Sequence, residues 1–167
     1  MRFRALHECC EGDEGWRTWL QAYLACVAFA DSQVGRVLDA LDKSKYADHT
    51  IVIFTSDHGY HLGEHDFWAK GSLRDESAVA RLIISVPGKK PAVCNSFVEL
   101  IDLYPTLSSL CGLEVPKRIQ GKDISPTLDD PSHKVRDAAF CVAPARRGFL
   151  LREDKYAYIQ YSENAAN

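Results

Sequence analysis

A long helix-period pattern followed by a short apolar run constrains the fold of this chain most. Between residues 16 and 42 the apolar side chains recur in steps of three and four, which predicts one amphipathic helix. Residues 50–55 then read TIVIFT, a run rich in β-branched and aromatic residues. Such a run is typical of a strand buried on both faces of a parallel sheet. A helix followed by this kind of strand predicts an α/β fold wound around parallel strands.

Length and composition exclude several classes of protein. The 167 residues suffice for one domain of ordinary size. A hydrophobic share of 46% and a charged share of 26% exclude a disordered chain. The net charge of −3 gives no sign of nucleic-acid binding by bulk charge. No apolar run approaches the roughly 20 residues of a membrane-spanning helix, and residues 1–14 lack the pattern of a secretory signal.

Further strands are predicted in the second half of the chain. Residues 81–86 read RLIISV and predict a second buried strand, which Pro87 and Gly88 stop. Residues 97–101 are a candidate third strand. Residues 148–161 read GFLLREDKYAYIQY and predict a β-hairpin.

One short helix and the cysteines complete the outline. Asp102 is predicted as the N-cap of a helix that runs to Cys111, with Pro105 in its first turn and Gly112 at the C′ position. The six cysteines match no structural zinc spacing, and an even count permits either disulfides or buried thiols. The apolar patterns around Cys26 and Cys111 favour buried thiols there.

The segment 56–70, SDHGYHLGEHDFWAK, lacks periodicity and is predicted as a loop at the carboxyl end of the first strand. Asp57 and His58, fixed at a strand end, are suitable ligands for a divalent metal, and Gly59 lets the backbone turn beside them. Lys70 supplies a positive charge that could hold a sulfate or phosphate. A metal and a lysine that converge on one anion would stabilise charge developing on a transferred group.

The same residues permit a purely structural interpretation. In it Asp57 caps a turn and His58 is a hydrogen-bonded loop histidine. His61 and His65 are either further metal ligands or solvated loop histidines, and the second reading is the more common for such residues. Glu64 is interpreted as a capping or surface carboxylate.

Three more side chains in or near this segment have alternative readings. Trp68 is interpreted as a packing anchor in preference to a substrate platform. Asp75 and Glu76 follow Lys70 closely in sequence, so they either orient its ammonium group or belong to an exposed charged face.

Residues 22–88 closely resemble the sulfatase family of the alkaline-phosphatase-like superfamily, nearest to its iduronate-2-sulfatase and choline-sulfatase-like branches. The matching pieces there are AYLACVAFADSQVGRVLDAL, TIVIFTSDHGYHLGEHDFWAKGSLRDES and RLIISVPG. Later pieces also resemble family segments, namely VELIDLYPTLSSLCGLEVP, GKDISPTL and REDKYAYIQY.

The resemblance implies a fold. Residues 1–145 would form the C-terminal part of a three-layer αβα sandwich with a mostly parallel sheet. Residues 146–167 would begin a small C-terminal antiparallel sheet.

The resemblance also implies roles for three residues. Asp57 and His58 would be ligands of a divalent metal, usually calcium, and Lys70 would contact the substrate sulfate. Calcium prefers about six to eight oxygen ligands, so an imidazole nitrogen is atypical for it. Other members of the superfamily use zinc, magnesium or manganese in similar places. The substrate would be a sulfated small molecule or saccharide, with no nucleic-acid or membrane partner.

The family's nucleophile motif is absent from this sequence. Family members convert the Cys or Ser of C/S-x-P/A-S/T-R to formylglycine. Residues 141–146 read CVAPAR, which has the wrong spacing and no Ser or Thr. The paired aspartates and an additional active-site His that the family carries elsewhere are not found either. We therefore expect a C-terminal portion of a sulfatase, with formylglycine only in the missing N-terminal part.

Several functional expectations follow from this interpretation. The chain would be a sulfuric ester hydrolase fragment, inactive alone and poorly soluble or dependent on a partner. The alternatives are a phosphoric-ester or phosphonate hydrolase of the same superfamily and a non-catalytic protein that binds a metal or anion. Family members are commonly periplasmic, extracellular or lysosomal.

Overall fold

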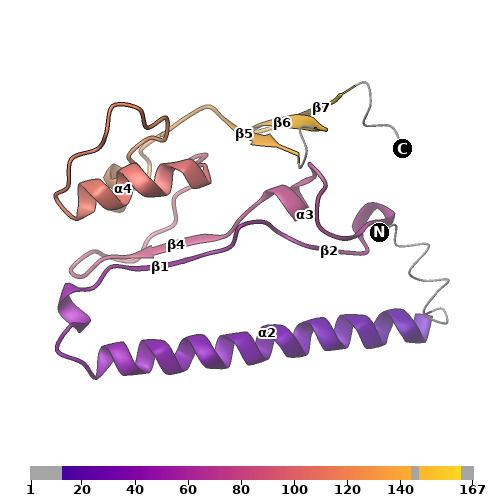
Figure 1. Cartoon of the computed structure of the whole chain (residues 1–167), viewed down its shortest axis with the longest axis horizontal. Coiled ribbons are helices and arrows are strands. Elements are labelled where there is room, and N and C mark those ends of the chain that lie inside the picture. The colour runs from indigo at the N-terminus through magenta and orange to yellow at the C-terminus, as the bar shows by residue number, and fades with distance from the viewer. Residues whose placement is uncertain (1–12, 144–146, 163–167) are drawn as a thin grey trace. The chain divides into compact units, whose positions relative to one another are not determined.

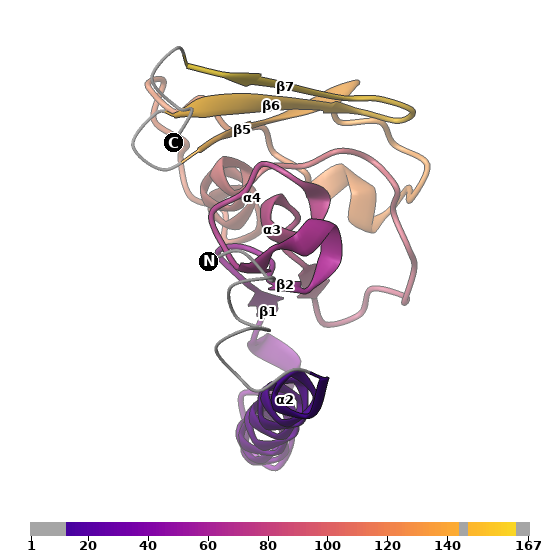
Figure 2. The ribbon, with the colours of Figure 1, turned by 90° about the vertical axis from the view of Figure 1, so that its right-hand side faces the viewer.

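The computed structural model describes residues 13–143 and 147–162 of the chain (Figures 1 and 2). These residues divide into two compact units. The first unit comprises residues up to 70 together with 81–87, and the second comprises residues 71–80 and those from 88 onwards. Asp57, His58 and Lys70 all belong to the first unit.

The first unit begins with one long helix, α2 (Asp13–Asp42), which confirms the helix predicted from the apolar steps. A 3₁₀ turn (Ala47–His49) follows it. Figure 1 shows α2 as one unbroken helix. Many apolar side chains of α2 are exposed, for example Phe29 and Val37.

Both predicted strands of the first unit form, but they pair differently from the expectation. β1 (Val52–Thr55) and β4 (Leu82–Ser85) run antiparallel, with Val52 opposite Ser85, and make a two-stranded sheet. The prediction that both strands are buried on both faces was wrong, since Phe54 is 50% and Ile83 is 61% exposed. Two strands bonded to each other lack the flanking strands that would enclose them in a larger sheet.

The sheets of the described residues are all small and antiparallel. The mostly parallel sheet of a three-layer sandwich is therefore not seen in residues 13–143 and 147–162. What the structure shares with the expectation is the mixture of helices and strands of an α/β chain.

The loop predicted after β1 contains a small hairpin. Its strands are β2 (His61–Leu62) and β3 (Trp68–Ala69), which pair antiparallel around a 3₁₀ turn (Glu64–Asp66). Residues 56–60 before it have no regular structure, as expected.

The described residues of the second unit form two α-helices, two 3₁₀ turns and one sheet. Residues 97–101 were predicted as a strand, and this was wrong, because the chain turns there into a 3₁₀ helix that leads directly into the helix α4 (Leu103–Leu110). The elements in chain order are α3 (Asp75–Ala78), a 3₁₀ turn (Leu100–Asp102), α4 (Leu103–Leu110), a second 3₁₀ turn (Ser125–Leu128), β5 (Ala138–Val142), β6 (Gly148–Glu153) and β7 (Ala157–Tyr161).

The ends of α4 agree with the prediction in position. Gly112 has φ of 67° at the C′ position, and the Leu113 N–H donates to the Ser108 carbonyl at 2.8 Å, as in a Schellman motif. Asp102 stands at the N-cap position, but its side chain does not cap α4. Its carboxylate accepts hydrogen bonds from other segments, described below.

The sheet of the second unit has the order β5-β6-β7, and β6 pairs antiparallel with both neighbours. The β6–β7 pair confirms the predicted hairpin. Leu73, Ala143 and Leu150 form the buried core, and Cys141 and Ile159 pack against them. Figure 2 shows the three strands side by side.

The four described cysteines carry free thiols. Cys26 and Cys111 are exposed, so the prediction that they are buried was wrong. Cys26 is exposed on α2, and Cys111 is the exposed C-cap residue of α4. Cys9 and Cys10 lie outside the described residues.

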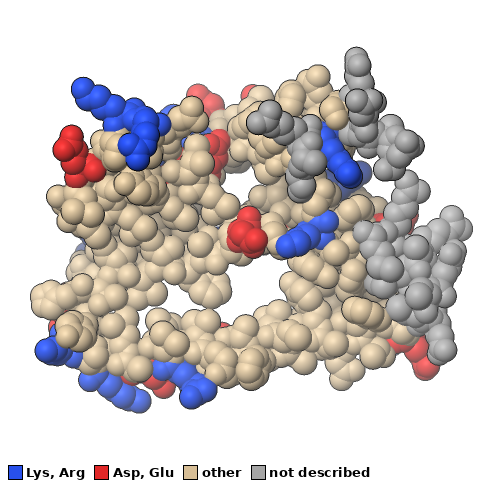
Figure 3. Space-filling view, viewed as in Figure 1, with Lys and Arg blue, Asp and Glu red and all other residues tan. Residues whose placement is uncertain are grey.

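Surface charge of both signs is spread over the face drawn in Figure 3, in keeping with the small net charge. Among the residues that the structure describes, none of the helices has the length and apolarity needed to cross a membrane.

Candidate metal and anion site

The three predicted site residues lie together in the first unit. Asp57 and His58 follow β1, and Lys70 follows β3. The His58 Nδ1 atom lies 2.7 Å from the Gly59 carbonyl oxygen. Because a carbonyl oxygen only accepts, Nδ1 must carry the proton, and Nε2 then keeps its lone pair.

Two charged groups face this Nε2 atom. The Lys70 Nζ lies 2.8 Å from Nε2 and donates to it, and the Asp57 Oδ2 lies 3.5 Å from the same nitrogen. The structure thus brings together an imidazole, a carboxylate and an ammonium group that are as much as 13 positions apart in sequence.

The residues fit one side of a metal centre. Histidine ligands in proteins are commonly oriented by an Nδ1–H or Nε2–H bond to a backbone carbonyl, and His58 makes such a bond to Gly59. The Asp57 side chain is 83% exposed and its oxygens are accessible to an ion. However, the described part of the chain has no cluster of three or more His, Cys, Asp or Glu side chains that could hold a metal. Two ligands fall well short of the roughly six to eight that calcium requires.

The hairpin that carries Lys70 is anchored by buried side chains. His61 is fully buried and Trp68 is 4% exposed, and the two lie on the paired strands β2 and β3. The Tyr60 ring stacks on Tyr23 of α2 at 5.1 Å and meets the Trp68 ring edge-on at 6.3 Å. These contacts confirm Trp68 as a packing anchor.

The other histidines of the segment have different environments. The expectation of a solvated His61 was wrong, because its ring packs edge-on against Phe67 at 5.0 Å within the hairpin. His65 is exposed and lies in the 3₁₀ turn with φ of 57°. Glu64 acts as a local cap, since its Oε2 accepts the Leu62 N–H at 2.7 Å.

The charged residues after Lys70 belong to the second unit. Both carboxylate oxygens of Asp75 lie 3.2 Å from the Arg152 Nε, so this carboxylate forms an ion pair with β6. Glu76 is half-buried.

Left-handed backbone is concentrated in the same hairpin. Three described residues other than glycine have positive φ, and they are His65 (57°), Asp66 (55°) and Ala69 (78°). A left-handed conformation costs an ordinary residue about 1–2 kcal/mol. The strain is greatest for Ala69, because Asn, Asp and His tolerate this region better than alanine does. Strain of this kind is typical of functional segments.

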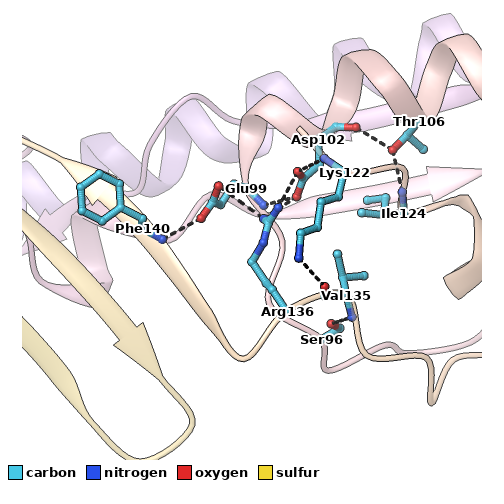
Figure 4. Close-up of polar contacts among 9 residues, drawn as sticks. All are labelled: Ser96, Glu99, Asp102, Thr106, Lys122, Ile124, Val135, Arg136 and Phe140. Atoms are coloured by element: carbon cyan, nitrogen blue, oxygen red, sulfur yellow. Dashed lines mark hydrogen bonds and ion pairs between the residues drawn. The ribbon is translucent and has the colours of Figure 1, made fainter. Parts of the chain in front are cut away.

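A second polar cluster was missed in the sequence analysis and lies in the second unit (Figure 4). The fully buried Asp102 carboxylate accepts two hydrogen bonds from the Arg136 guanidinium, at 2.6 and 2.8 Å. It also accepts the Lys122 N–H at 2.8 Å and the Glu99 N–H at 2.7 Å. Asp102 thereby joins three segments that are distant in sequence.

Two neighbours extend this cluster. The Thr106 hydroxyl donates to the Asp102 carbonyl at 2.6 Å and accepts the Ile124 N–H at 3.0 Å. The Glu99 carboxylate accepts the Phe140 N–H at 2.8 Å. The cluster thus bonds the segments before and after α4 to this helix and its N-terminus, and it bonds Glu99 to β5.

The hydrogen bonds set the ionisation of Asp102. Burial disfavours its charged form, but the bonds from Arg136, from the Lys122 N–H and from the Glu99 N–H outweigh burial. Together they hold the pKa of Asp102 below its ordinary value of 3.8. The hydrogen bond to Asp102 likewise raises the pKa of Arg136. This ion pair is therefore a structural one that remains charged at neutral pH.

Comparison with known proteins bears on both units. A sulfatase family model matches residues 9–113, and a model described as "N-sulphoglucosamine sulphohydrolase, C-terminal" matches residues 63–166. A sulfatase of Formosa agariphila is 38% identical over 152 residues, which cover 89% of this chain and 29% of the relative. Human iduronate 2-sulfatase is 40% identical over 124 residues, which cover 59% of this chain and 22% of the relative.

Solved structures agree with these relatives. The structure of a protein in complex with its substrate D-glucosamine-2-N,6-O-disulfate has a TM-score of 0.77 and 30% identity, with 90% of this chain and 33% of that chain covered. A phosphonate monoester hydrolase from Silicibacter pomeroyi has a TM-score of 0.71 and 27% identity, with 78% and 30% covered. The chain spans about a third of each of these structures and less than a third of the curated relatives. With a family model that matches residues 9–113 and a 38% identical relative, the chain belongs to the sulfatase family.

Proposed function

We propose that this chain supplies the metal-ligand and anion-binding part of a sulfuric ester hydrolase site. The observation that carries the proposal is the convergence of Asp57 and Lys70 on the Nε2 atom of His58, at 3.5 and 2.8 Å. The names of the relatives support the same reaction class, because they include a sulfatase and an iduronate 2-sulfatase.

The residues have distinct roles in this proposal. Asp57 Oδ2 and His58 Nε2 hold a divalent cation, for which the family favours calcium, and the remaining ligands come from outside this chain. When bound, the cation neutralises negative charge on the sulfate group. When the cation occupies the Nε2 lone pair, the Lys70 ammonium no longer donates to that nitrogen, and this compact point charge donates to a sulfate oxygen instead. The Gly59 carbonyl keeps the His58 proton on Nδ1, so that Nε2 faces the cation.

The nucleophile is not among these residues. The sequence contains no C/S-x-P/A-S/T-R motif, so formylglycine would be supplied by a part of the protein that lies outside the present sequence. In the whole protein residues 1–145 would belong to a three-layer αβα sandwich, and residues 146–167 would begin a small antiparallel sheet. The exposed apolar side chains of β1 and β4, Phe54 and Ile83, support this, since a sandwich would cover them.

The proposed substrate class is a sulfated saccharide. Support comes from the similar structure that holds a glucosamine disulfate and from the iduronate 2-sulfatase relatives. A sugar sulfate would present one compact anion to Lys70.

The metal part of the proposal is tested by calorimetric titration with Ca²⁺ of the whole protein, in which the remaining ligands are present. Asp57→Asn should weaken binding by about tenfold or more, because a ligand oxygen loses its charge. Asp48→Asn is the matched control, since Asp48 is exposed in the same unit but lies in the 3₁₀ turn (Ala47–His49) before β1. Equal affinity of the wild type and Asp57→Asn would contradict the assigned ligand.

The anion part is tested with inorganic sulfate in the presence of Ca²⁺. Lys70→Met should weaken sulfate binding by about tenfold or more, and Lys43→Met, at an exposed position after α2, should not. The chain alone should not hydrolyse an aryl sulfate. Robust turnover by the chain alone would contradict the proposal that the nucleophile lies outside the present sequence.

A phosphonate or phosphoric ester is the second candidate substrate, because the structure from Silicibacter pomeroyi is a phosphonate monoester hydrolase. Lys70 as a point charge suits either anion. Competition decides between them: methylphosphonate should displace sulfate only weakly if the site is built for sulfate esters. Tighter binding of methylphosphonate than of sulfate would favour the second candidate.

A further inference from the structure

Ala69 has an unusual backbone conformation directly beside Lys70. Its φ is 78°, whereas a residue of an antiparallel strand ordinarily has φ of about −140°. The difference rotates the chain that follows Ala69 by roughly half a turn. The direction in which Lys70 leaves the hairpin therefore depends on this one torsion angle.

The residue before Ala69 cannot share in this rotation. Trp68 is 4% exposed and pairs with Leu62 in the hairpin, and Ala69 itself stands opposite the fully buried His61. These anchors fix the backbone up to the Cα atom of Ala69. Beyond it, the Lys70 side chain is exposed, and its Nζ reaches the His58 Nε2 at 2.8 Å.

We propose that Ala69 is a positioning residue, whose left-handed conformation aims the Lys70 ammonium at His58 and so at the anion. The inference rests on the proposed function for its anion, but the direction of Lys70 can be tested without any ligand. Residues other than glycine, asparagine and aspartate rarely adopt positive φ. A strained alanine at this position therefore indicates a functional constraint on the backbone.

The test compares variants that tolerate positive φ with one that does not. Ala69→Gly and Ala69→Asn accept the left-handed region, whereas Ala69→Val strongly disfavours it because valine is β-branched. Ala25→Val, at an exposed position of α2, is the matched control for a valine introduced elsewhere in the same unit. If the conformation of Ala69 sets the direction of Lys70, the effect of each variant should depend on how well its residue 69 tolerates positive φ. The size and polarity of that side chain should not matter.

The first readout is the ¹⁵N chemical shift of His58 Nε2, which responds to the hydrogen bond from Lys70. We expect Ala69→Val to move this resonance to the position seen in Lys70→Met, and Ala69→Gly, Ala69→Asn and Ala25→Val to leave it in place. An unmoved resonance in Ala69→Val would overturn the proposal. If Ala69→Val does not fold, Ala69→Asn still decides, because a shift like that of Lys70→Met in this variant would also overturn it.

The second readout is the affinity for inorganic sulfate in the presence of Ca²⁺. Ala69→Val should lose about tenfold or more, as Lys70→Met does, while Ala69→Asn should stay within about twofold of the wild type. Wild-type binding retained in Ala69→Val would overturn the proposal. A wild type that binds no sulfate would instead refute the proposed function and leave the Nε2 resonance as the test of positioning.

Discussion

The Asp102–Arg136 ion pair gives the most direct test of what holds the second unit together. Arg136→Met keeps most of the aliphatic bulk of the side chain and removes the guanidinium. The Asp102 carboxylate would then be fully buried without the group that donates two of its hydrogen bonds. Breaking one side of a buried ion pair costs about 3–5 kcal/mol, because the remaining charge is left uncompensated. We expect a loss of this size in the free energy of unfolding.

Urea denaturation followed by circular dichroism measures this loss. The matched control is Lys134→Met, which removes another ion pair of the same unit. That pair, Lys134–Asp137, is exposed on both sides, so its loss should change the free energy of unfolding by less than about 1 kcal/mol. If Arg136→Met proved no more destabilising than Lys134→Met, the argument from burial would be refuted.

Acid titration provides an independent check of the same pair. The folded-state pKa of Asp102 lies below its ordinary value of 3.8, so the ionised carboxylate stabilises the fold fully above that value. The contribution is lost as the pH falls below 3.8 and through the folded-state pKa. Asp102→Asn should therefore be less stable at pH 7 and should lose less further stability in acid than the wild type. Parallel curves for the two proteins would contradict the assigned pKa shift.

Other predictions concern glycines and a buried hydroxyl, and each is measured by the same denaturation. Gly121→Ala should destabilise by about 1–3 kcal/mol, because a Cβ there would lie 2.0 Å from the Ile101 carbonyl oxygen. An unchanged midpoint would mean that this backbone contact relaxes freely. Gly35→Ala, in the middle of α2 with nothing within 4 Å, should instead stabilise the helix by up to about 1 kcal/mol, and a loss would show a contact that the structure lacks. Thr106→Val should cost about 1–3 kcal/mol, because it removes the hydroxyl between Asp102 and Ile124; a neutral result would show that this bridge is dispensable.

Local patterns in the sequence predicted several of the individual elements. The apolar steps of α2, the β-branched runs of β1 and β4, and Gly112 at the end of α4 each act through nearby residues. Such signals depend on backbone preference and side-chain periodicity, both of which can be read from a short window.

Features that depend on distant partners could not be predicted in this way. The direction in which β4 pairs with β1 is decided between strands about 30 residues apart, and sequence periodicity is the same for either direction. Arg136 lies 34 residues from Asp102 in an irregular segment, so nothing near it marks it as the partner of a buried carboxylate. Residues 97–101 carry strand-like side chains, but Glu99 and Asp102 close a capping box there and turn the chain into a helix.

The candidate site was predicted in its members but not in its geometry. Asp57, His58 and Lys70 were identified from their residue types and from resemblance to the sulfatase family. The conformation of Ala69 has no signature in the sequence, because alanine ordinarily avoids positive φ. The burial of His61 was likewise hidden, since the two-residue strands that enclose it are too short to produce a periodic pattern.

The side-chain bonds of Asp102 and Thr106 also have a consequence for hydrogen exchange. The amide protons of Glu99, Lys122 and Ile124 lie outside the α-helices and strands, and such amides usually exchange quickly with water. Here each is held by an oxygen of one of these two buried residues. They can exchange only when the segments before and after α4 separate from it. These loop amides should therefore exchange at one common slow rate, as reporters of a single cooperative opening of the second unit.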